Sequence, residues 1–180
     1  AIRTGAASGL ATDILARKDA NTLGIIGTGR QARTQILAIA AVRDLATVRV
    51  FGRDEARRAA FAADIGKELD CEVIAANSAE DCIRGADIAV TMTTSAEPVL
   101  FGEWLSPGTH VNATGANGYA RRELDDAAVL RASLVVTDQR EQAKVEAREF
   151  IDLAAAGQLV WEDVAELGAL VRGDAAGRKD

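Results

Sequence analysis

The residues best suited to chemistry lie in one short turn, Gly27, Thr28 and Gly29. An apolar run, residues 23–26, precedes the turn, and a helical pattern begins at Arg30. The run has the length of a buried parallel strand and is too short for a helix of its own. The turn therefore joins a predicted strand to the start of a predicted helix, where backbone amides are free to bind a ligand.

Together with Ala32, the two glycines form the pattern G-x-G-x-x-A. In the dinucleotide fingerprint these small residues allow a tight turn, close approach of the backbone to a pyrophosphate, and close packing of helix on strand. Free amides at the helix start would then face the phosphates. Small-residue turns also serve packing alone, but the position of this one between strand and helix favours a bound dinucleotide.

The rest of the chain repeats this alternation of apolar runs and helical patterns. Strands are predicted at residues 23–27, 47–51, 71–76, 87–92, 109–113 and 133–137. Helices are predicted at residues 4–17, 30–43, 54–69, 78–84, weakly at 122–131, and at 139–156 and 161–171. Strands that alternate with helices imply βαβ units with right-handed crossovers. We therefore predict an α/β fold, a doubly wound, Rossmann-type parallel sheet in a three-layer αβα arrangement, with strand order 3-2-1-4-5-6.

Three loops of this predicted sheet have a composition suited to ligand binding. In the order 3-2-1-4-5-6 the first and fourth strands are neighbours at the switch point, where ligands bind. The loops after strands one, four and five, residues 27–31, 91–95 and 114–117, would therefore meet at one edge. All three are rich in Gly, Thr, Ser or Asn. Ordinary loop composition explains any one of them, whereas all three at the same edge indicate a site.

The end of the second predicted strand indicates which dinucleotide is bound. Domains that prefer the unphosphorylated cofactor have Asp or Glu there, on the ribose 2′-hydroxyl. Here Gly52 occupies that position and Arg53 follows, with Arg57 and Arg58 one turn further on. Gly52 leaves room for a 2′-phosphate and Arg53 can pair with it, although a solvated basic helix start would look the same. Asp54 either caps the helix or faces the ribose. We predict NADP(H), with NAD(H) as the alternative.

Length, charge and cysteine content limit the class of protein. The 180 residues fit one domain, which we place at residues 1–172, followed by a polar tail at residues 173–180. The net charge of −6 argues against binding to nucleic acid or to acidic membranes, because both need a basic surface. No apolar stretch approaches the roughly 20 residues of a membrane helix. Two cysteines are too few for a disulfide framework or a zinc site, so we expect reduced thiols and a cytoplasmic protein.

Several motifs, taken together, resemble those of one known family. They are Arg3 and Thr4, residues 27–32, residues 93–95 with 97–100, residues 108–115 (GTHVNATG), and residues 122–125 (RELD). In order and spacing they resemble the ornithine cyclodeaminase/mu-crystallin family, which includes certain alanine dehydrogenases and ketimine or cyclic-imine reductases. The resemblance implies that this chain is a cofactor domain. A separate domain that binds substrate and forms a homodimer would then lie outside it.

The resemblance also assigns roles to particular residues. It implies that Arg3 holds the substrate carboxylate beside the nicotinamide, which suits a guanidinium fork; a solvated helix-start arginine is the alternative. Residues predicted to bind the cofactor are Thr4, Gly27, Thr28, Gly29, Arg30, Gln31, Gly52, Arg53, Thr93, Thr94, Ser95, Thr114, Gly115, Ala116 and Arg121.

Asn117 departs from the family pattern. The resemblance implies an aspartate here in ornithine cyclodeaminases, which binds the distal amine of the substrate and relays protons. Asn117 can hydrogen-bond but cannot exchange a proton near neutrality. Arg121 likewise stands where the pattern often has lysine. These changes disfavour ornithine cyclisation and leave hydride transfer intact, because the nicotinamide performs that step.

We therefore predict an enzyme, a nicotinamide-dependent oxidoreductase that transfers hydride between its cofactor and a small imino or amino acid, with Arg3 and Asn117 as the catalytic residues. The runner-up is an ornithine cyclodeaminase with bound NAD, which would produce proline and ammonia. A second class is a non-catalytic protein of the mu-crystallin type, which binds cofactor and sequesters a small ligand.

Four further features invite a functional interpretation, and for three of them a structural one is favoured. His110 could act in acid–base catalysis, but a core or strand-end histidine is favoured. Asp87 begins the fourth strand, away from the predicted site, so a surface role is the default. Tyr119 could close over substrate or pack between domains. The charged run at residues 141–149 is typical of a solvated helical face.

Overall fold

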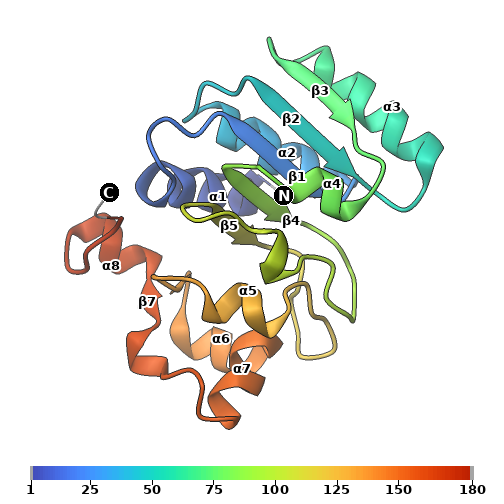
Figure 1. Ribbon diagram of the computed structural model, residues 1–180. Helices are drawn as coiled ribbons and strands as arrows, with labels where there is room; N and C mark the ends of the chain where they lie inside the picture. The colour runs from blue at the N-terminus through green and yellow to red at the C-terminus, as the bar shows by residue number, and fades with distance from the viewer. Residues whose placement is uncertain (1, 179–180) are drawn as a thin grey trace.

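Five parallel strands form the central sheet of the structure, a computed structural model that describes residues 2–178 (Figure 1). The strands are β1 (Thr22–Ile26), β2 (Thr47–Phe51), β3 (Glu72–Ala75), β4 (Ile88–Thr91) and β5 (His110–Ala113). They lie in the order β3-β2-β1-β4-β5, and every neighbouring pair is parallel. The predicted doubly wound topology is confirmed, and the switch point lies between β1 and β4.

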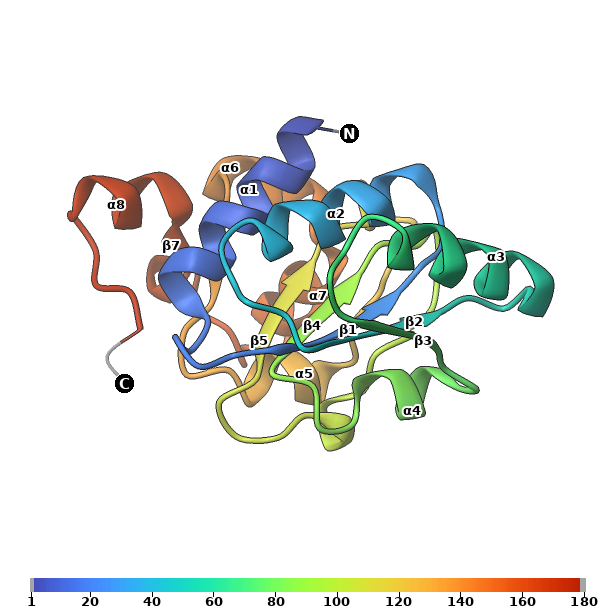
Figure 2. The ribbon, with the colours of Figure 1, turned by 90° about the horizontal axis from the view of Figure 1, so that it is seen from above.

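Helices cover both faces of the sheet, which confirms the predicted three layers (Figure 2). One face carries α1 (Ile2–Leu15), α2 (Arg30–Ala40) and α3 (Glu55–Gly66), and the other carries α4 (Ala79–Ile83) and α5 (Asp126–Leu130). The helix α7 (Arg148–Ala155) packs against α5. A hydrophobic core lies on each face of the sheet, and side chains of β1 contribute to both. Leu23 and Ile25 pack with α2 and α3, whereas Ile26 packs with α4 and α5. This division follows from the two-residue period of a strand that is covered on both faces.

Two glycines on α1 allow that helix to pack closely against α2. A Cβ atom at Gly5 would lie 2.6 Å from the carbonyl oxygen of Thr34, and one at Gly9 would lie 2.8 Å from that of Ala38. Because both distances are too short for a side chain, only glycine lets α1 approach α2 this closely. Since Gly5 faces Thr34 and Gly9 faces Ala38, the two helices run in the same direction. The start of α1, with Arg3, therefore lies at the same edge of the sheet as the start of α2, which is the edge where the strands end.

The prediction of a sixth strand in the main sheet is wrong. Within residues 133–137, the strand β6 (Val136–Thr137) pairs in parallel with β7 (Ala165–Glu166) in a separate two-stranded sheet. The backbone N–H of Ala165 also donates to the carbonyl oxygen of Val135 over 3.0 Å. The apolar composition of the run favours a strand, but the partner of a strand is decided by long-range packing that local composition does not encode.

The helices of the last third also differ from the predicted ones. The predicted helix 139–156 is divided at Ala147, whose ψ of 85° is not helical, into α6 (Arg140–Glu146) and α7. The predicted helix 161–171 consists of a 3₁₀ turn, η2 (Trp161–Asp163), followed by β7 and α8 (Leu167–Arg172). The weak pattern at 122–131 yields only α5. A further 3₁₀ turn, η1 (Gly102–Trp104), precedes β5.

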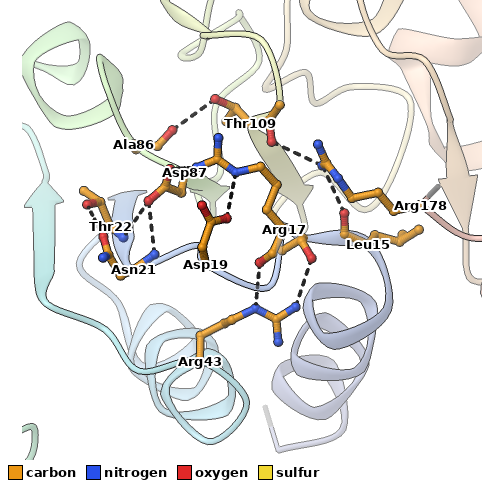
Figure 3. Close-up of polar contacts among 12 residues, drawn as sticks. Leu15, Arg17, Asp19, Asn21, Thr22, Arg43, Ala86, Asp87, Thr109 and Arg178 are labelled. Carbon is orange, nitrogen blue, oxygen red and sulfur yellow. Dashed lines mark hydrogen bonds and ion pairs between the residues drawn. The ribbon is translucent and has the colours of Figure 1, made fainter. Parts of the chain in front are cut away.

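Hydrogen bonds and ion pairs connect the chain segments at the sheet edge where the strands begin (Figure 3). One carboxylate oxygen of Asp87 accepts from the backbone N–H groups of Asn21 and Thr22, both over 3.1 Å, and the other pairs with Arg17. The side chain of Arg43 is buried and donates to the carbonyl oxygens of Ala16 and Arg17. Asp87 therefore has a defined structural role and is not merely a surface residue.

The single histidine lies in the core, as the favoured interpretation predicts. His110 is 8% exposed, and its Nε2 lies 3.2 Å from Oδ1 of Asn112. The amide of Asn112 in turn donates to the hydroxyl of Thr12 on α1 over 2.9 Å. Burial lowers the pKa of His110 from 6.5 to about 4. This side chain belongs to the contact between β5 and α1 and is neutral at pH 7.

The lowered pKa of His110 predicts a pH-dependent stability. Between pH 6.5 and about 4 the unfolded chain takes up a proton that the folded chain does not, so the free energy of unfolding falls as the pH is lowered through this window. The full effect is about 3 kcal/mol. Urea unfolding at a series of pH values would measure it. The variant His110→Gln should lose this part of the acid dependence, and an unchanged slope in the variant would contradict the assignment.

Candidate dinucleotide site

The turn after β1 has a backbone geometry that only glycine allows at its first position. Gly27 has a φ of +131°, in the region that favours glycine. Its N–H donates to the carbonyl oxygen of Phe51 over 2.8 Å, and a Cβ atom here would lie 2.3 Å from the carbonyl oxygen of Met92. The glycine therefore lets the end of β1 pass between the ends of β2 and β4, at the switch point.

The second glycine of the turn leaves the start of α2 open. Gly29 is the N-cap residue of α2, and no side chain caps the helix at this end. A Cβ atom on Gly29 would have no neighbour within 4 Å. Helix N-termini present free N–H groups and a positive dipole end, which together bind anions. The turn therefore fits the pyrophosphate of a dinucleotide, because it offers uncapped amides and open space beside them.

The three predicted loops meet at one cleft along the edge where the strands end. The cleft also reaches the first turn of α1 and the free edge of β5. Every residue predicted to act in catalysis or cofactor binding lines it, namely Arg3, Thr4, Gly27, Thr28, Gly29, Arg30, Gln31, Gly52, Arg53, Thr93, Thr94, Ser95, Thr114, Gly115, Ala116, Asn117 and Arg121. The structure therefore brings together residues from five separate stretches of the sequence.

The end of β2 differs in detail from the prediction. Gly52 lines the cleft, and a Cβ atom on it would lie 2.8 Å from the Thr28 hydroxyl, so the side chain of Thr28 packs against this glycine. Arg58, by contrast, does not face the cleft. It is buried, with its guanidinium 5.4 Å from the centre of the Phe51 ring and a 2.9 Å hydrogen bond to the carbonyl oxygen of Gly52.

Two arginines at the end of β2 remain available to an anion. Arg53 and Arg57 are exposed and line the cleft. Of the two roles considered for Asp54, the structure shows the helix cap, in which Oδ1 accepts from the N–H of Arg57 over 2.9 Å. The side of the cleft next to β2 therefore presents two guanidinium groups, with the exposed, helix-capping Asp54 between them in the sequence.

A fully buried carboxylate, that of Glu123, connects the loops after β4 and β5. Its Oε1 accepts from the N–H and the hydroxyl of Thr93, over 2.6 and 2.7 Å. Its Oε2 accepts from the hydroxyl of Thr91 over 2.9 Å and from the N–H of Gly115 over 2.7 Å. A Cβ atom on Gly115 would lie 2.5 Å from Oε1, so glycine is required there. The motif at residues 122–125 marks Glu123 in the sequence, but nothing local reveals these partners.

The prediction of a solvated face at residues 141–149 is wrong for Glu149. This side chain is 5% exposed, and its Oε1 accepts from the N–H groups of Glu123 and Leu124, over 2.7 and 3.3 Å. The division of the predicted helix at Ala147 gives α7 its own direction, with Glu149 in its first turn. Elsewhere in the run, Glu141 is exposed and pairs with Lys144 over 2.7 Å, as predicted.

The residues expected to act on substrate lie at the open side of the cleft. Arg3 is exposed in the first turn of α1. Asn117 is exposed in the loop after β5, and its Oδ1 accepts from Arg121 over 2.7 Å. Tyr119, in the same loop, packs against α7: its hydroxyl donates to Asp152 over 3.0 Å, and the guanidinium of Arg148 lies 5.7 Å from its ring centre. Tyr119 is 54% exposed, and these contacts hold it beside α7 of the same chain.

A family model described as the ornithine cyclodeaminase/mu-crystallin family matches residues 1–180. The chain belongs to this family. The resemblance that the sequence motifs indicate is therefore confirmed over the whole length of the chain.

Individual relatives match with similar coverage. A Delta(1)-pyrroline-2-carboxylate reductase of Bacillus cereus is 40% identical over 179 residues, which are 99% of this chain and 55% of the relative. The structure of the Thermococcus litoralis Delta(1)-pyrroline-2-carboxylate reductase in complex with NADH and L-proline has a TM-score of 0.94 and 39% identity, over 99% of this chain and 55% of that one.

An archaeal alanine dehydrogenase dimer with bound NAD has a TM-score of 0.89 and 36% identity, over 99% of this chain and 54% of that one. The chain thus spans about half the length of the relatives that it matches. Among residues 2–178, no helix combines the length and the apolar character needed to cross a bilayer.

Proposed function

We propose that this chain is the cofactor-binding half of an NAD(P)-dependent oxidoreductase that transfers hydride between the nicotinamide and a small imino or amino acid. The observation that carries this proposal is the uncapped start of α2 at Gly29, next to the positive-φ turn at Gly27 and at the switch point of the sheet. Relatives support it, because the Thermococcus litoralis reductase contains NADH and L-proline and the archaeal alanine dehydrogenase contains NAD.

Each half of the sheet would bind one half of the cofactor. In doubly wound dinucleotide folds each half binds one mononucleotide, so β1–β3 would take the adenosine half and β4 with β5 the nicotinamide half. The amides of Thr28, Gly29 and Arg30 would bind the pyrophosphate. Residues of the loops after β4 and β5 would hold the second ribose and the nicotinamide. When bound, the nicotinamide supplies the hydride chemistry.

Arg3 would bind the substrate carboxylate. It lies on the helix whose start is brought beside that of α2, and it is exposed to the cleft. A guanidinium holds a carboxylate by two parallel hydrogen bonds, which fixes the adjacent carbon for hydride transfer. Its position at the open side of the cleft is consistent with a site completed by another domain.

Asn117 argues against ornithine cyclisation. Its amide oxygen already accepts from Arg121, so its NH₂ group is the part left to bind a ligand. An amide NH₂ donates a hydrogen bond but does not exchange protons near neutrality. This position therefore cannot serve as the proton relay that the cyclodeaminase mechanism would place here, whereas hydride transfer itself is performed by the nicotinamide.

We further propose that the cofactor is NADP(H) rather than NAD(H). The support is the exposed pair Arg53 and Arg57 at the end of β2, together with the use of Asp54 as a helix cap. A 2′-phosphate would meet guanidinium groups there, while Oδ1 of Asp54 is engaged by the N–H of Arg57.

The proposal extends to the whole protein. Half-length coverage of the relatives supports a second domain that contributes to the substrate site, and the dimeric alanine dehydrogenase supports a homodimer. The substrate would be a small imino or amino acid, by analogy with the proline in the Thermococcus litoralis complex. The free thiols Cys71 and Cys82 suit a cytoplasmic location.

Turnover by the full-length polypeptide that contains this chain tests the proposal. We expect NADPH consumption with 1-pyrroline-2-carboxylate or a related cyclic imine, and no ammonia from ornithine. Ammonia release from ornithine without net change in the cofactor would identify a cyclodeaminase instead. Binding of cofactor without turnover of any imine, keto acid or amino acid would indicate a binding protein of the mu-crystallin type.

A further inference from the structure

The buried carboxylate of Glu123 is not explained by stability alone. Burying a carboxylate costs free energy unless its oxygens are fully hydrogen-bonded. Here both oxygens are satisfied, each by one backbone N–H and one hydroxyl. Apolar side chains would fill such a place without this requirement. The arrangement therefore points to a need for fixed geometry around Glu123.

The two backbone donors come from different loops. Oε1 binds the N–H of Thr93, after β4, and Oε2 binds the N–H of Gly115, after β5. A backbone N–H can only donate, so each oxygen must accept. The carboxylate thus fixes the distance between these two loops, because that distance can change only if one of the two hydrogen bonds lengthens or breaks. Both loops line the cleft at the half of the sheet that would take the nicotinamide.

Glu123 is itself held rigidly from both sides. Its carbonyl oxygen accepts from the N–H groups of Val99 and Leu100, over 2.9 and 3.1 Å. Its N–H donates to the buried Glu149 on α7 over 2.7 Å. Because the backbone is anchored in this way, the carboxylate cannot follow a movement of either loop. It holds the loops instead.

We propose that Glu123 is a positioning residue that sets the spacing of the two loops around the nicotinamide half of the cofactor, without contacting the cofactor. This inference rests on the proposed function, because it assumes that the cleft binds a dinucleotide. It predicts that damage to Glu123 acts on the nicotinamide half and spares the adenosine and pyrophosphate half.

The isosteric variant Glu123→Gln tests the inference in the 180-residue chain. One end of the new amide is an NH₂ group, which must face the N–H of Thr93 or of Gly115, donor against donor. In the cofactor-free variant we expect hydrogen exchange at these two amides to accelerate about tenfold or more. Exchange at Gly27, which is bonded to Phe51 elsewhere in the site, should not change.

Ligand binding gives the second measurement. We expect the Kd for NADH to rise about tenfold or more in Glu123→Gln, whereas the Kd for ADP-ribose, which lacks the nicotinamide, should stay within about twofold. The control is Glu162→Gln, which removes the same charge from an exposed side chain outside the cleft. It should leave both constants unchanged.

The outcomes of these measurements distinguish a failure of the role proposed for Glu123 from a failure of the proposed function. Equal weakening of NADH and ADP-ribose, or no weakening of either, would overturn the role of Glu123. Failure of the wild-type chain to bind NADPH as well as NADH and ADP-ribose would overturn the proposed function, and this inference with it. If Glu123→Gln does not fold, Thr91→Val removes one of the same hydrogen bonds from a buried hydroxyl. It must then show the same selective loss of NADH, and an unselective loss would overturn the inference.

Discussion

Replacing Gly27 with alanine is expected to lower the free energy of unfolding by about 2–4 kcal/mol and to abolish NADH binding. The φ of +131° disfavours any side chain, and the new Cβ would lie 2.3 Å from the carbonyl oxygen of Met92. Because that oxygen belongs to the backbone, the end of β1 or of β4 must shift. Urea unfolding followed by circular dichroism, together with NADH titration, would measure both effects.

The matched variant Gly29→Ala separates folding from binding. Gly29 has a φ of −95°, and its Cβ would have no neighbour within 4 Å, so the free energy of unfolding should change by less than about 1 kcal/mol. NADH affinity should nevertheless fall about tenfold or more, because the methyl group would stand where the backbone must approach the pyrophosphate. If Gly29→Ala bound NADH as tightly as the wild type, the turn would not be the phosphate site.

The second large effect is expected at Arg53. Replacing it with alanine should weaken NADPH binding about 10- to 100-fold and change NADH binding by less than about twofold. The reason is that the exposed guanidinium would pair with the 2′-phosphate that only NADPH carries. Calorimetric titration with both cofactors would measure the two dissociation constants.

Arg84→Ala is the control for this prediction. It removes the same charge from an exposed residue outside the cleft that pairs with Glu80 over 2.6 Å. Both cofactors should bind this variant as they bind the wild type. The NADP(H) assignment would be overturned by an equal fall for both cofactors in Arg53→Ala, or by wild-type protein that binds NADH about tenfold more tightly than NADPH.

The parts of the fold that the sequence predicts are those with a local physical cause. The turn at Gly27 and Gly29 follows directly from the need for positive φ and for open space at a helix start. The order β3-β2-β1-β4-β5 follows from alternating strands and helices, because chain connectivity allows few arrangements of such units. The cleft at the switch point is a consequence of that order.

The errors arise where a residue's partner is distant in the sequence. The run at 133–137 has strand composition, yet its partner is Ala165–Glu166 and not β5. Glu149 lies in a charged run and has the spacing of a solvated helix, but its carboxylate reaches the backbone of Glu123. Glu123 in turn binds two loops that only the folded sheet brings together. No local pattern contains these partners.

The most direct test of the account is to locate the amides that respond to a dinucleotide. We would titrate the 180-residue chain with NADPH and follow its assigned backbone amides by heteronuclear NMR. A dinucleotide bound at this turn would give saturable shifts at Thr28, Gly29 and Arg30, at the start of α2. Shifts confined to other parts of the chain, or no shift with NADPH or NADH, would contradict it.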